Sequence, residues 1–189
     1  MTRTLDIVGL CGSLRKASYN RSAMKLAGEL MPATMKLETV EWRDFPVFDG
    51  DVFAQGLPPQ VAALRERVRR ADGVLVVTPE YNYSVPGGLK NVLDWLSRGE
   101  DQPWAGKPVA IMSATMGPLG GARMQYDLRK IMLFLNAQVL IKPEVFIGMA
   151  HTKFDAAGNC ADEVTRKFVT DQMLAFERWI GGIERMRAG

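Results

Sequence analysis

The sequence is poor in the residues on which several kinds of active site depend. Within its 189 residues it has one histidine, His151, and two cysteines, Cys11 and Cys160, which lie far apart. A zinc site needs a cluster of cysteine, histidine or carboxylate ligands, and a Ser-His-Asp triad would have to use the single histidine. Two distant cysteines do not make the disulfide framework of a small secreted protein. We therefore expect no metal site, no histidine-based triad and no disulfide.

Long apolar runs and blocks of like charge are missing as well. No segment is long and apolar enough for a signal peptide or a membrane-spanning helix. The 24 Lys and Arg against 21 Asp and Glu give a formal net charge of +3, and the charges are interspersed. This mild excess favours anionic ligands but does not indicate nucleic-acid binding. We expect a cytoplasmic protein with neither a membrane nor a nucleic-acid partner.

What the sequence does have is an ordinary globular composition and a regular alternation of two patterns. A content of 47% hydrophobic and 24% charged residues suits one domain that spans residues 1–189. Short apolar runs alternate with segments that have apolar residues at three- and four-residue spacing. The runs predict strands at 5–10, 37–42, 73–77, 109–114 and 139–141, the last extending toward 145–147. The spaced segments predict helices at 21–31, 59–70, 89–97 and 122–135.

A last amphipathic pattern at 162–186 predicts a helix that closes the domain. A stripe of apolar residues along it would cover one face of the sheet. The residues on or near this stripe are Val164, Phe168, Met173, Phe176 and Ile180.

The alternation of strands and helices predicts a doubly wound α/β fold, a parallel sheet with helices on both faces. Strands that are nearly continuous in Val, Ile and Leu are typical of sheets covered on both sides, and their crossovers are right-handed. Ligands of such sheets bind outside the carboxyl ends of the strands, so the loops that follow the strands are of most interest. The segment 45–59, which contains Pro and Gly, is expected to be a long, mobile connection.

The loop after the first strand combines groups that bind phosphate. Arg15 can form a charge-assisted contact, and Ser13, Ser18 and Asn20 can donate hydrogen bonds near the start of the next helix. The loop has neither the G-x-G-x-x-G spacing of dinucleotide folds nor that of a P-loop, so a terminal monophosphate fits better than a pyrophosphate. The alternative is that Ser18 and Asn20 only cap the helix.

The loop after the third strand is the most informative stretch of the chain. It contains Pro79, Glu80, Tyr81, Asn82 and Tyr83, and the prolines and glycines around them predict an extended loop. Exposed aromatic rings and amides on a rigid sheet suit a flat heteroaromatic ligand. The alternative is that the two tyrosines only pack at the rim of the fold.

The loop after the fourth strand is rich in glycine. Ser113 is followed by Gly117 and then by the pair Gly120 and Gly121. Glycines let a backbone approach a ligand closely, although the segment is equally well explained as a tight turn between a strand and a helix. Its place at the same edge of the sheet as the other two loops favours binding.

Taken together and in this order, the three loops resemble those of the NAD(P)H-dependent FMN reductases, which include bacterial quinone, azo-dye and chromate reductases. The resemblance covers nearly the whole chain. Its motifs are Gly12-Ser13-x-Arg15-x-x-Ser18-x-Asn20, Pro79-Glu80-Tyr81-Asn82 with Pro86-Gly87-x-Leu89-Lys90-Asn91 behind it, and Gly117-x-x-Gly120-Gly121-x-Arg123. It implies a flavodoxin-like fold, with a five-stranded parallel sheet in the order 2-1-3-4-5.

The resemblance also implies a cofactor, its ligands and an assembly. FMN is the implied cofactor, with NADPH or NADH as co-substrate. The implied ligands of the FMN phosphate are Ser13, Arg15, Ser18 and Asn20, those lining the isoalloxazine ring are Pro79, Glu80, Tyr81, Asn82 and Tyr83, and those approaching its other edge are Ser113 and Gly117. The implied assembly is a homodimer or homotetramer, with Arg123, Tyr126 and Glu144 at an interface.

The implied activity is hydride transfer from a reduced nicotinamide to a small acceptor by way of the flavin, with no nucleophile from the protein. If both substrates use one site in turn, the kinetics are ping-pong. Quinones, free FMN, azo compounds, nitroaromatics and chromate all suit an open flavin, so the acceptor is undecided. Arg15 and Lys16 favour NADPH over NADH, because a cation can bind the 2′-phosphate of NADPH.

Three alternatives are left open by the sequence. A flavodoxin that carries single electrons has the same fold and cofactor, although a pI near 8.9 does not suit an acidic docking face. A flavodoxin-like binding module without flavin is compatible with the fold. The third alternative is a redox role for Cys11, which lies beside the first loop, although an isolated cysteine is more often a small hydrophobic residue.

Overall fold

The computed structural model describes residues 3–189 and contains a parallel β-sheet at its centre. The strands run side by side in the order β2-β1-β3-β4-β5, and β6 also pairs with β4. Their bounds are β1 Leu5–Cys11, β2 Met35–Val40, β3 Gly73–Val77, β4 Pro108–Ala114, β5 Gln138–Val139 and β6 Val145–Ile147. The predicted doubly wound, flavodoxin-like architecture and its strand order are confirmed.

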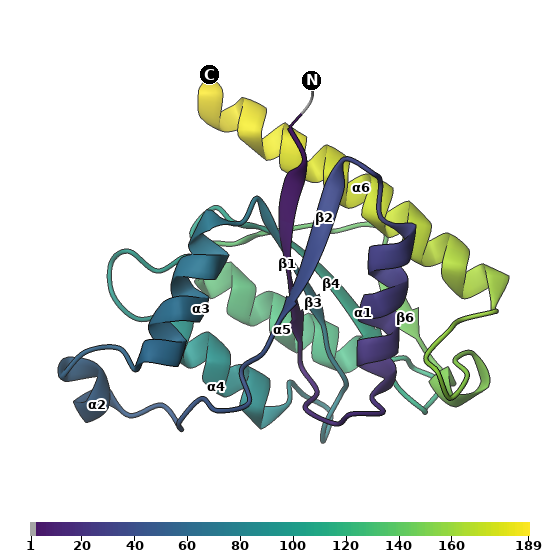
Figure 1. Ribbon diagram of the computed structural model, residues 1–189, viewed down its shortest axis with the longest axis horizontal. Coiled ribbons are helices and arrows are strands. Elements are labelled where there is room, and N and C mark those ends of the chain that lie inside the picture. The colour runs from purple at the N-terminus through teal and green to yellow at the C-terminus, as the bar shows by residue number, and fades with distance from the viewer. Residues whose placement is uncertain (1–2) are drawn as a thin grey trace.

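Helices cover both faces of the sheet (Figure 1). Residues of α1 and α6 belong to one buried apolar cluster, and residues of α3, α4 and α5 belong to the other. The bounds are α1 Tyr19–Leu30, α2 Gly50–Ala54, α3 Pro59–Arg70, α4 Gly87–Leu96, α5 Ala122–Phe134, the 3-10 helix η1 Ala150–Thr152, and α6 Glu163–Ala188. The predicted helices are all present, whereas the two short ones, α2 and η1, were not predicted.

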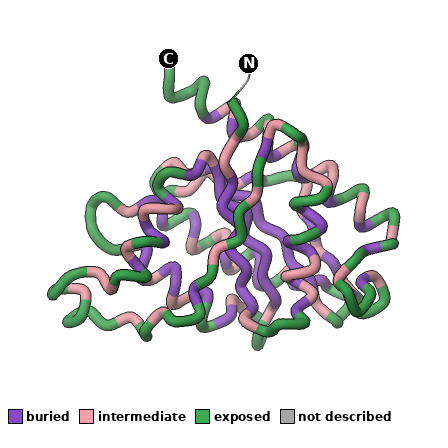
Figure 2. Tube along the Cα trace, in the orientation of Figure 1, coloured by how far each residue is buried: buried purple, intermediate pink, exposed green. Residues whose placement is uncertain are grey.

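The central strands are buried on both sides, which explains why their sequences are almost entirely apolar. In β3 the side chains of Leu75 and Val77 pack toward α1 and α6, while Val74 and Val76 pack toward α3, α4 and α5. This alternation follows from the two-residue repeat of a strand. Figure 2 shows the result as a buried band along the strands inside an exposed outer layer.

The fifth strand is split, and a side chain fills the break. The chain leaves the sheet after Val139, so Ile141 is 68% exposed and the predicted strand at 139–141 was wrong at its end. Opposite this break the amide of Gln172, on α6, donates to the carbonyls of Ile111 at 3.1 Å and Pro143 at 2.9 Å. A buried glutamine therefore provides the hydrogen bond that the missing strand residues would have made to β4.

The buried stripe of α6 differs from the predicted one at its start. Met173, Phe176 and Ile180 are fully buried, as expected, but Val164 is 62% exposed and Phe168 is 52% exposed. Steps of four residues back along the helix from Met173 lead to Val169 and then to Thr165, and both are buried. The buried stripe therefore passes through these two residues and not through Phe168 and Val164. One residue corresponds to about 100° of rotation, which turns the two exposed side chains off the stripe.

The segment 45–59 is anchored at its beginning and carries α2 near its middle. The side chain of Asn91, on α4, accepts a hydrogen bond from the backbone N–H of Phe48 at 2.7 Å. The amide nitrogen of Asn91 and the indole of Trp95 both donate to the carbonyl of Pro46, each at 2.8 Å. The first part of the segment that was expected to be mobile is thus fixed to α4.

Within residues 3–189, no helix combines the length and the apolar character that crossing a bilayer requires.

The two phenylalanines of α6 provide a test of this fold. We expect Phe176→Ala to lower the free energy of unfolding by about 3–5 kcal/mol, because it leaves a cavity in the core. Phe168→Ala removes a half-exposed ring and should cost less than about 1 kcal/mol. Urea unfolding followed by circular dichroism measures both, and equal losses would contradict the placement of α6.

Candidate functional site

The loops after β1, β3 and β4 meet at one edge of the sheet, at the bottom of Figure 1. This is the carboxyl-terminal edge, where doubly wound proteins bind their ligands. Close packing joins the first two loops. A Cβ atom on Gly12 would lie 2.0 Å from the hydroxyl oxygen of Thr78, so only glycine allows this contact. The sequence therefore places its three unusual loops together, as predicted.

The first loop presents two exposed cations, Arg15 and Lys16, and a capped helix. Ser18 is the N-cap of α1, and its hydroxyl accepts a hydrogen bond from the backbone N–H of Asn20 at 3.2 Å. Ser13 is buried beside it, while Arg15 is exposed and forms no ion pair within residues 3–189. The capping role considered for Ser18 is thus present, and Arg15 is available to an anion.

Asn20 holds the first loop against the third. Its side-chain nitrogen donates to the carbonyl of Ala114 at 2.9 Å, and its side-chain oxygen accepts from the N–H of Ala114 at 2.9 Å. The residue is 2% exposed. Because both ends of the amide bind Ala114, the side chain of Asn20 positions the loop, and its second N–H is not used in these two bonds.

The loop after β3 is a tight turn and not the extended loop that the sequence predicted. Tyr81 and Ser84 exchange two backbone hydrogen bonds of 3.0 Å, and Asn82 and Tyr83 at the corner have φ of 49° and 69°. A left-handed conformation is uncommon for a tyrosine. Gly87, expected in the loop, instead begins α4. The turn leaves Tyr81 52% exposed and Tyr83 68% exposed.

Glu80 ties this turn to α5. Its carboxylate accepts a hydrogen bond from Arg123 at 2.8 Å and another from the backbone N–H of Met124 at 3.3 Å, at the start of the helix. The guanidinium of Arg123 also lies 3.5 Å from the ring centre of Tyr83. The hydrogen bond to Glu80 raises the pKa of Arg123 further above its ordinary value, so the guanidinium stays charged. The side chain of Glu80 is therefore a brace.

The buried side chain of Gln125 stabilises the third loop through Ser113. The hydroxyl of Ser113, fully buried, donates to the carbonyl of Gly120 at 2.5 Å and accepts from the amide of Gln125 at 2.7 Å. Gln125 also donates to the carbonyl of Val145 at 2.8 Å, which connects the loop to β6. Gly117, by contrast, is exposed and has open space beside its α-carbon. Nothing in the sequence distinguishes Gln125 from any other polar residue of a helix.

The predicted site residues thus divide into two groups. Three of them use their side chains to hold the loops in place: Asn20 joins the first loop to the third, Glu80 joins the turn after β3 to α5, and Ser113 closes the third loop on itself. The exposed ones are Arg15, Tyr81, Asn82, Tyr83 and Gly117, and those with little exposure are Ser13, Ser18 and Pro79. A phosphate beside Arg15 and a flat ring between the tyrosines and Gly117 fit this arrangement.

The redox alternative for Cys11 receives no support from its surroundings. The side chain is 4% exposed, and its thiol donates to the carbonyl of Ser13 at 3.6 Å. Burial raises the pKa of the thiol, which keeps it protonated and poorly nucleophilic. His151, in contrast, lies exposed on η1.

Two of the three residues expected at an interface lie together on one surface. Tyr126 is 54% exposed and its ring centre lies 6.5 Å from that of Phe146. Although burial opposes it, the ion pair with Lys142 holds the pKa of Glu144 below its ordinary value, and Tyr126 also donates to this carboxylate. Arg123, the third residue, is the partner of Glu80 described above.

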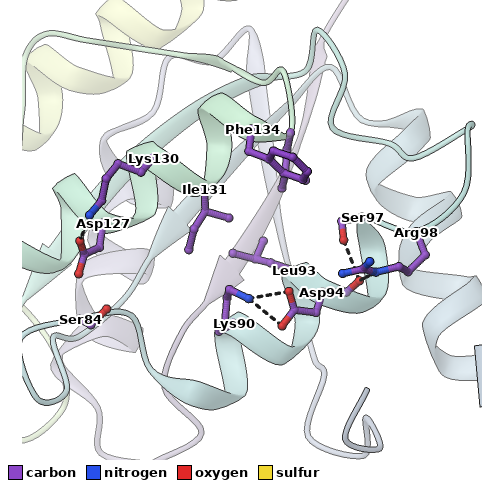
Figure 3. Close-up of a pocket in the computed structure, with 11 residues that line it drawn as sticks. Ser84, Lys90, Leu93, Asp94, Ser97, Arg98, Asp127, Lys130, Ile131 and Phe134 are labelled. Carbon is purple, nitrogen blue, oxygen red and sulfur yellow. Dashed lines mark hydrogen bonds and ion pairs between the residues drawn. The ribbon is translucent and has the colours of Figure 1, made fainter. Parts of the chain in front are cut away.

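A groove between α4 and α5 begins at the turn after β3 (Figure 3). It has a volume of about 570 Å³ and an apolar floor that includes Leu93 and Ile131. Ion pairs line its sides, Lys90 with Asp94 on α4 and Lys130 with Asp127 on α5, both at 2.6 Å. Phe134, at its end, is 87% exposed.

Comparison with known proteins agrees with this geometry. The model of the family described as NADPH-dependent FMN reductase matches residues 5–152. A quinone reductase of Escherichia coli K12 is 48% identical over 183 residues, covering 95% of this chain and 97% of that protein. An NAD(P)H-dependent FMN reductase of Pseudomonas aeruginosa is 43% identical over 180 residues, with the same coverage.

A solved structure of high similarity supports the same assignment. FerB, a flavoenzyme NAD(P)H:(acceptor) oxidoreductase from Paracoccus denitrificans, has a TM-score of 0.86 and 34% identity, covering 94% of this chain and 98% of that one. The resemblance seen in the loop motifs is confirmed. The chain belongs to the NADPH-dependent FMN reductase family of oxidoreductases, which use FMN and NAD(P)H.

Proposed function

We propose that this chain holds FMN at the three loops, takes hydride from NADPH or NADH, and passes it to quinones by a ping-pong mechanism. One observation carries the proposal. Side chains with little exposure hold the three loops in place, while a free arginine, two exposed tyrosines and an open glycine are left around the space between them. Such a rigid frame with polar and aromatic groups suits a cofactor that stays bound.

The phosphate end of FMN belongs at the first loop. Arg15 supplies a charge-assisted contact, and the N-terminus of α1 adds backbone N–H groups and the positive end of its dipole. Ser13 and Ser18 provide hydroxyls beside them. Asn20 contributes by keeping the start of α1 fixed against β4.

The ring end belongs between the other two loops. Tyr81, Asn82 and Tyr83 lie on a turn whose backbone and rings are exposed, and Gly117 lets the opposite backbone come close. Glu80 and Ser113 keep the two sides at a constant separation. Pro79 lies two residues after the end of β3, just before the turn.

When bound, FMN supplies the capacity to accept hydride from one substrate and give it to another. The chain's part is to orient both substrates and to stabilise charge with loop N–H groups. The high exposure of the two tyrosines leaves the site open and favours flat acceptors. Relatives named quinone reductase make quinones our first choice, and azo compounds, free FMN and chromate are further candidates. A cytoplasmic location stays a prediction from sequence.

Steady-state kinetics test the activity and its order. Protein purified with FMN should oxidise NADPH and reduce a benzoquinone, and double-reciprocal plots at several quinone concentrations should be parallel, because both substrates use one site in turn. Intersecting lines would show that both bind together and would refute the ping-pong mechanism. A protein that stays colourless with added FMN would refute the proposal as a whole.

Substitution of two neighbouring cations, one at a time, tests the proposed phosphate site. Arg15→Ala should raise the Kd for FMN about tenfold, since a contact to a charged group contributes about 1.5 kcal/mol or more. Lys16→Ala removes an equally exposed charge on the same loop and should change this Kd less than about threefold. Quenching of FMN fluorescence measures both values, and similar effects of the two variants would argue against a specific role for Arg15.

We also propose that the chain forms a homodimer or homotetramer through the outer face of α5. Tyr126, Leu133 and Phe134 of this helix expose 54%, 79% and 87% of their surface, and Phe134 also lines the groove of Figure 3. Large apolar side chains gathered on one face are typical of an interface. The ion pairs along the groove allow a second copy to dock by twofold symmetry, because each helix carries both signs of charge.

Light scattering after size-exclusion chromatography tests the assembly. The protein should show two or four times its chain mass of 21.0 kDa. Phe134→Asp should shift the protein toward monomer, because it places a charge in the apolar contact. Phe168→Asp, on α6, is the matched control and should leave the mass unchanged. A monomeric wild-type protein would refute this part of the proposal.

A further inference from the structure

A second cavity, of about 520 Å³, lies beside the loops assigned to FMN. One wall is Leu14, which stands between Ser13 and Arg15 of the first loop. A second wall is the start of α4 at Gly87, directly after the turn of the tyrosines. The third is the stretch 42–48 that follows β2. The cavity therefore borders the proposed flavin site on two sides.

The wall after β2 is held in place by hydrogen bonds, although it has no regular secondary structure. The indole of Trp42 donates to the carbonyl of Cys11 at 2.8 Å, at the end of β1. Asn91 accepts from the N–H of Phe48 at 2.7 Å and donates to the carbonyl of Pro46 at 2.8 Å. The cavity is thus preformed, which is typical of sites for small ligands.

The lining combines aromatic surface with a cation that has no ionic partner. Trp42, Phe45 and Phe48 provide the rings. Arg43 is exposed, donates to the carbonyl of Leu14 at 2.6 Å and forms no ion pair within the described part of the chain. The other cation, Lys90, is neutralised by Asp94 at 2.6 Å. The remaining guanidinium N–H groups of Arg43 are therefore the main attraction for an anion here.

We propose that this cavity binds the adenosine phosphate half of the reduced dinucleotide, with Arg43 on a phosphate and the aromatic wall against the adenine. The inference rests on the proposed function, since it needs the nicotinamide half at the flavin next door. A guanidinium binds phosphate oxygens in pairs, and aromatic rings stack on a purine. Lys16, which the sequence suggested for the 2′-phosphate, is exposed on the first loop and does not line the cavity.

The first test compares hydride donors that differ only in the adenosine half. With FMN-loaded protein, Arg43→Ala should raise the KM for NADPH about tenfold, since it removes a contact to a charged group. The KM for reduced nicotinamide mononucleotide, which has no adenosine, should not change. Arg43→Lys should restore part of the loss. Arg178→Ala, an exposed arginine on α6, is the control and should match the wild type.

The second test measures binding without any reaction. Adenosine 2′,5′-bisphosphate titrated into FMN-loaded protein in a calorimeter should bind wild type and Arg178→Ala alike, and Arg43→Ala about tenfold more weakly. This readout does not depend on reductase activity. A wild-type protein that oxidises no donor would refute the proposed function, while the titration would still decide on the cavity.

Comparing NADPH with NADH shows which phosphate Arg43 contacts. A loss confined to NADPH supports a contact between Arg43 and the 2′-phosphate, and an equal loss for NADH supports a contact with the pyrophosphate. Three results would overturn the proposal: unchanged binding of the bisphosphate in Arg43→Ala, an equal loss with the mononucleotide, or an NADPH effect that appears in Lys16→Ala in place of Arg43→Ala.

Discussion

The arrangement of the three loops depends on one buried amide. Asn20, in the first turn of α1, uses both side-chain groups on the peptide of Ala114, at the end of β4. β3 separates β1 from β4, so no strand pairing joins the first loop to the third. This pair of hydrogen bonds spans that distance. Because the groups are buried, leaving one unsatisfied would cost about 1–3 kcal/mol, which makes other positions of the loops unfavourable.

This rigidity allows the turn after β3 to keep a strained conformation. Asn82 and Tyr83 both have positive φ, and a tyrosine in that region costs on the order of 1–3 kcal/mol. Two hydrogen bonds between Tyr81 and Ser84, and the stacking of Arg123 on Tyr83, oppose relaxation. Arg123 is in turn fixed by Glu80. The strain is thus located at the residues that expose aromatic surface to the ligand, and the braces keep it there.

Sequence reasoning predicted the layers well and the roles of single polar residues poorly. The bounds of β3 and α3 were correct because a run of valines and a Pro at the helix start mark them clearly. The motif residues were brought together as expected, but a motif does not distinguish Arg15, which is free, from Asn20, Glu80 and Ser113, which are braces. That difference depends on neighbours from distant elements. Gln125 and Arg43 were missed because nothing in their local sequence sets them apart.

The proposed ping-pong mechanism requires that one ligand stays bound through the cycle and that the other leaves at every turnover, and the two neighbouring sites differ accordingly. The proposed flavin site is framed by loops that side-chain hydrogen bonds hold in place, so we expect its geometry to stay the same as substrates exchange. The cavity beside it relies on Arg43, which is exposed and shares its hydrogen bonds with water. A solvent-exposed charged contact mainly speeds association, and it adds little residence time because water competes for it directly. A dinucleotide held in this way leaves fast enough for the acceptor to take its place.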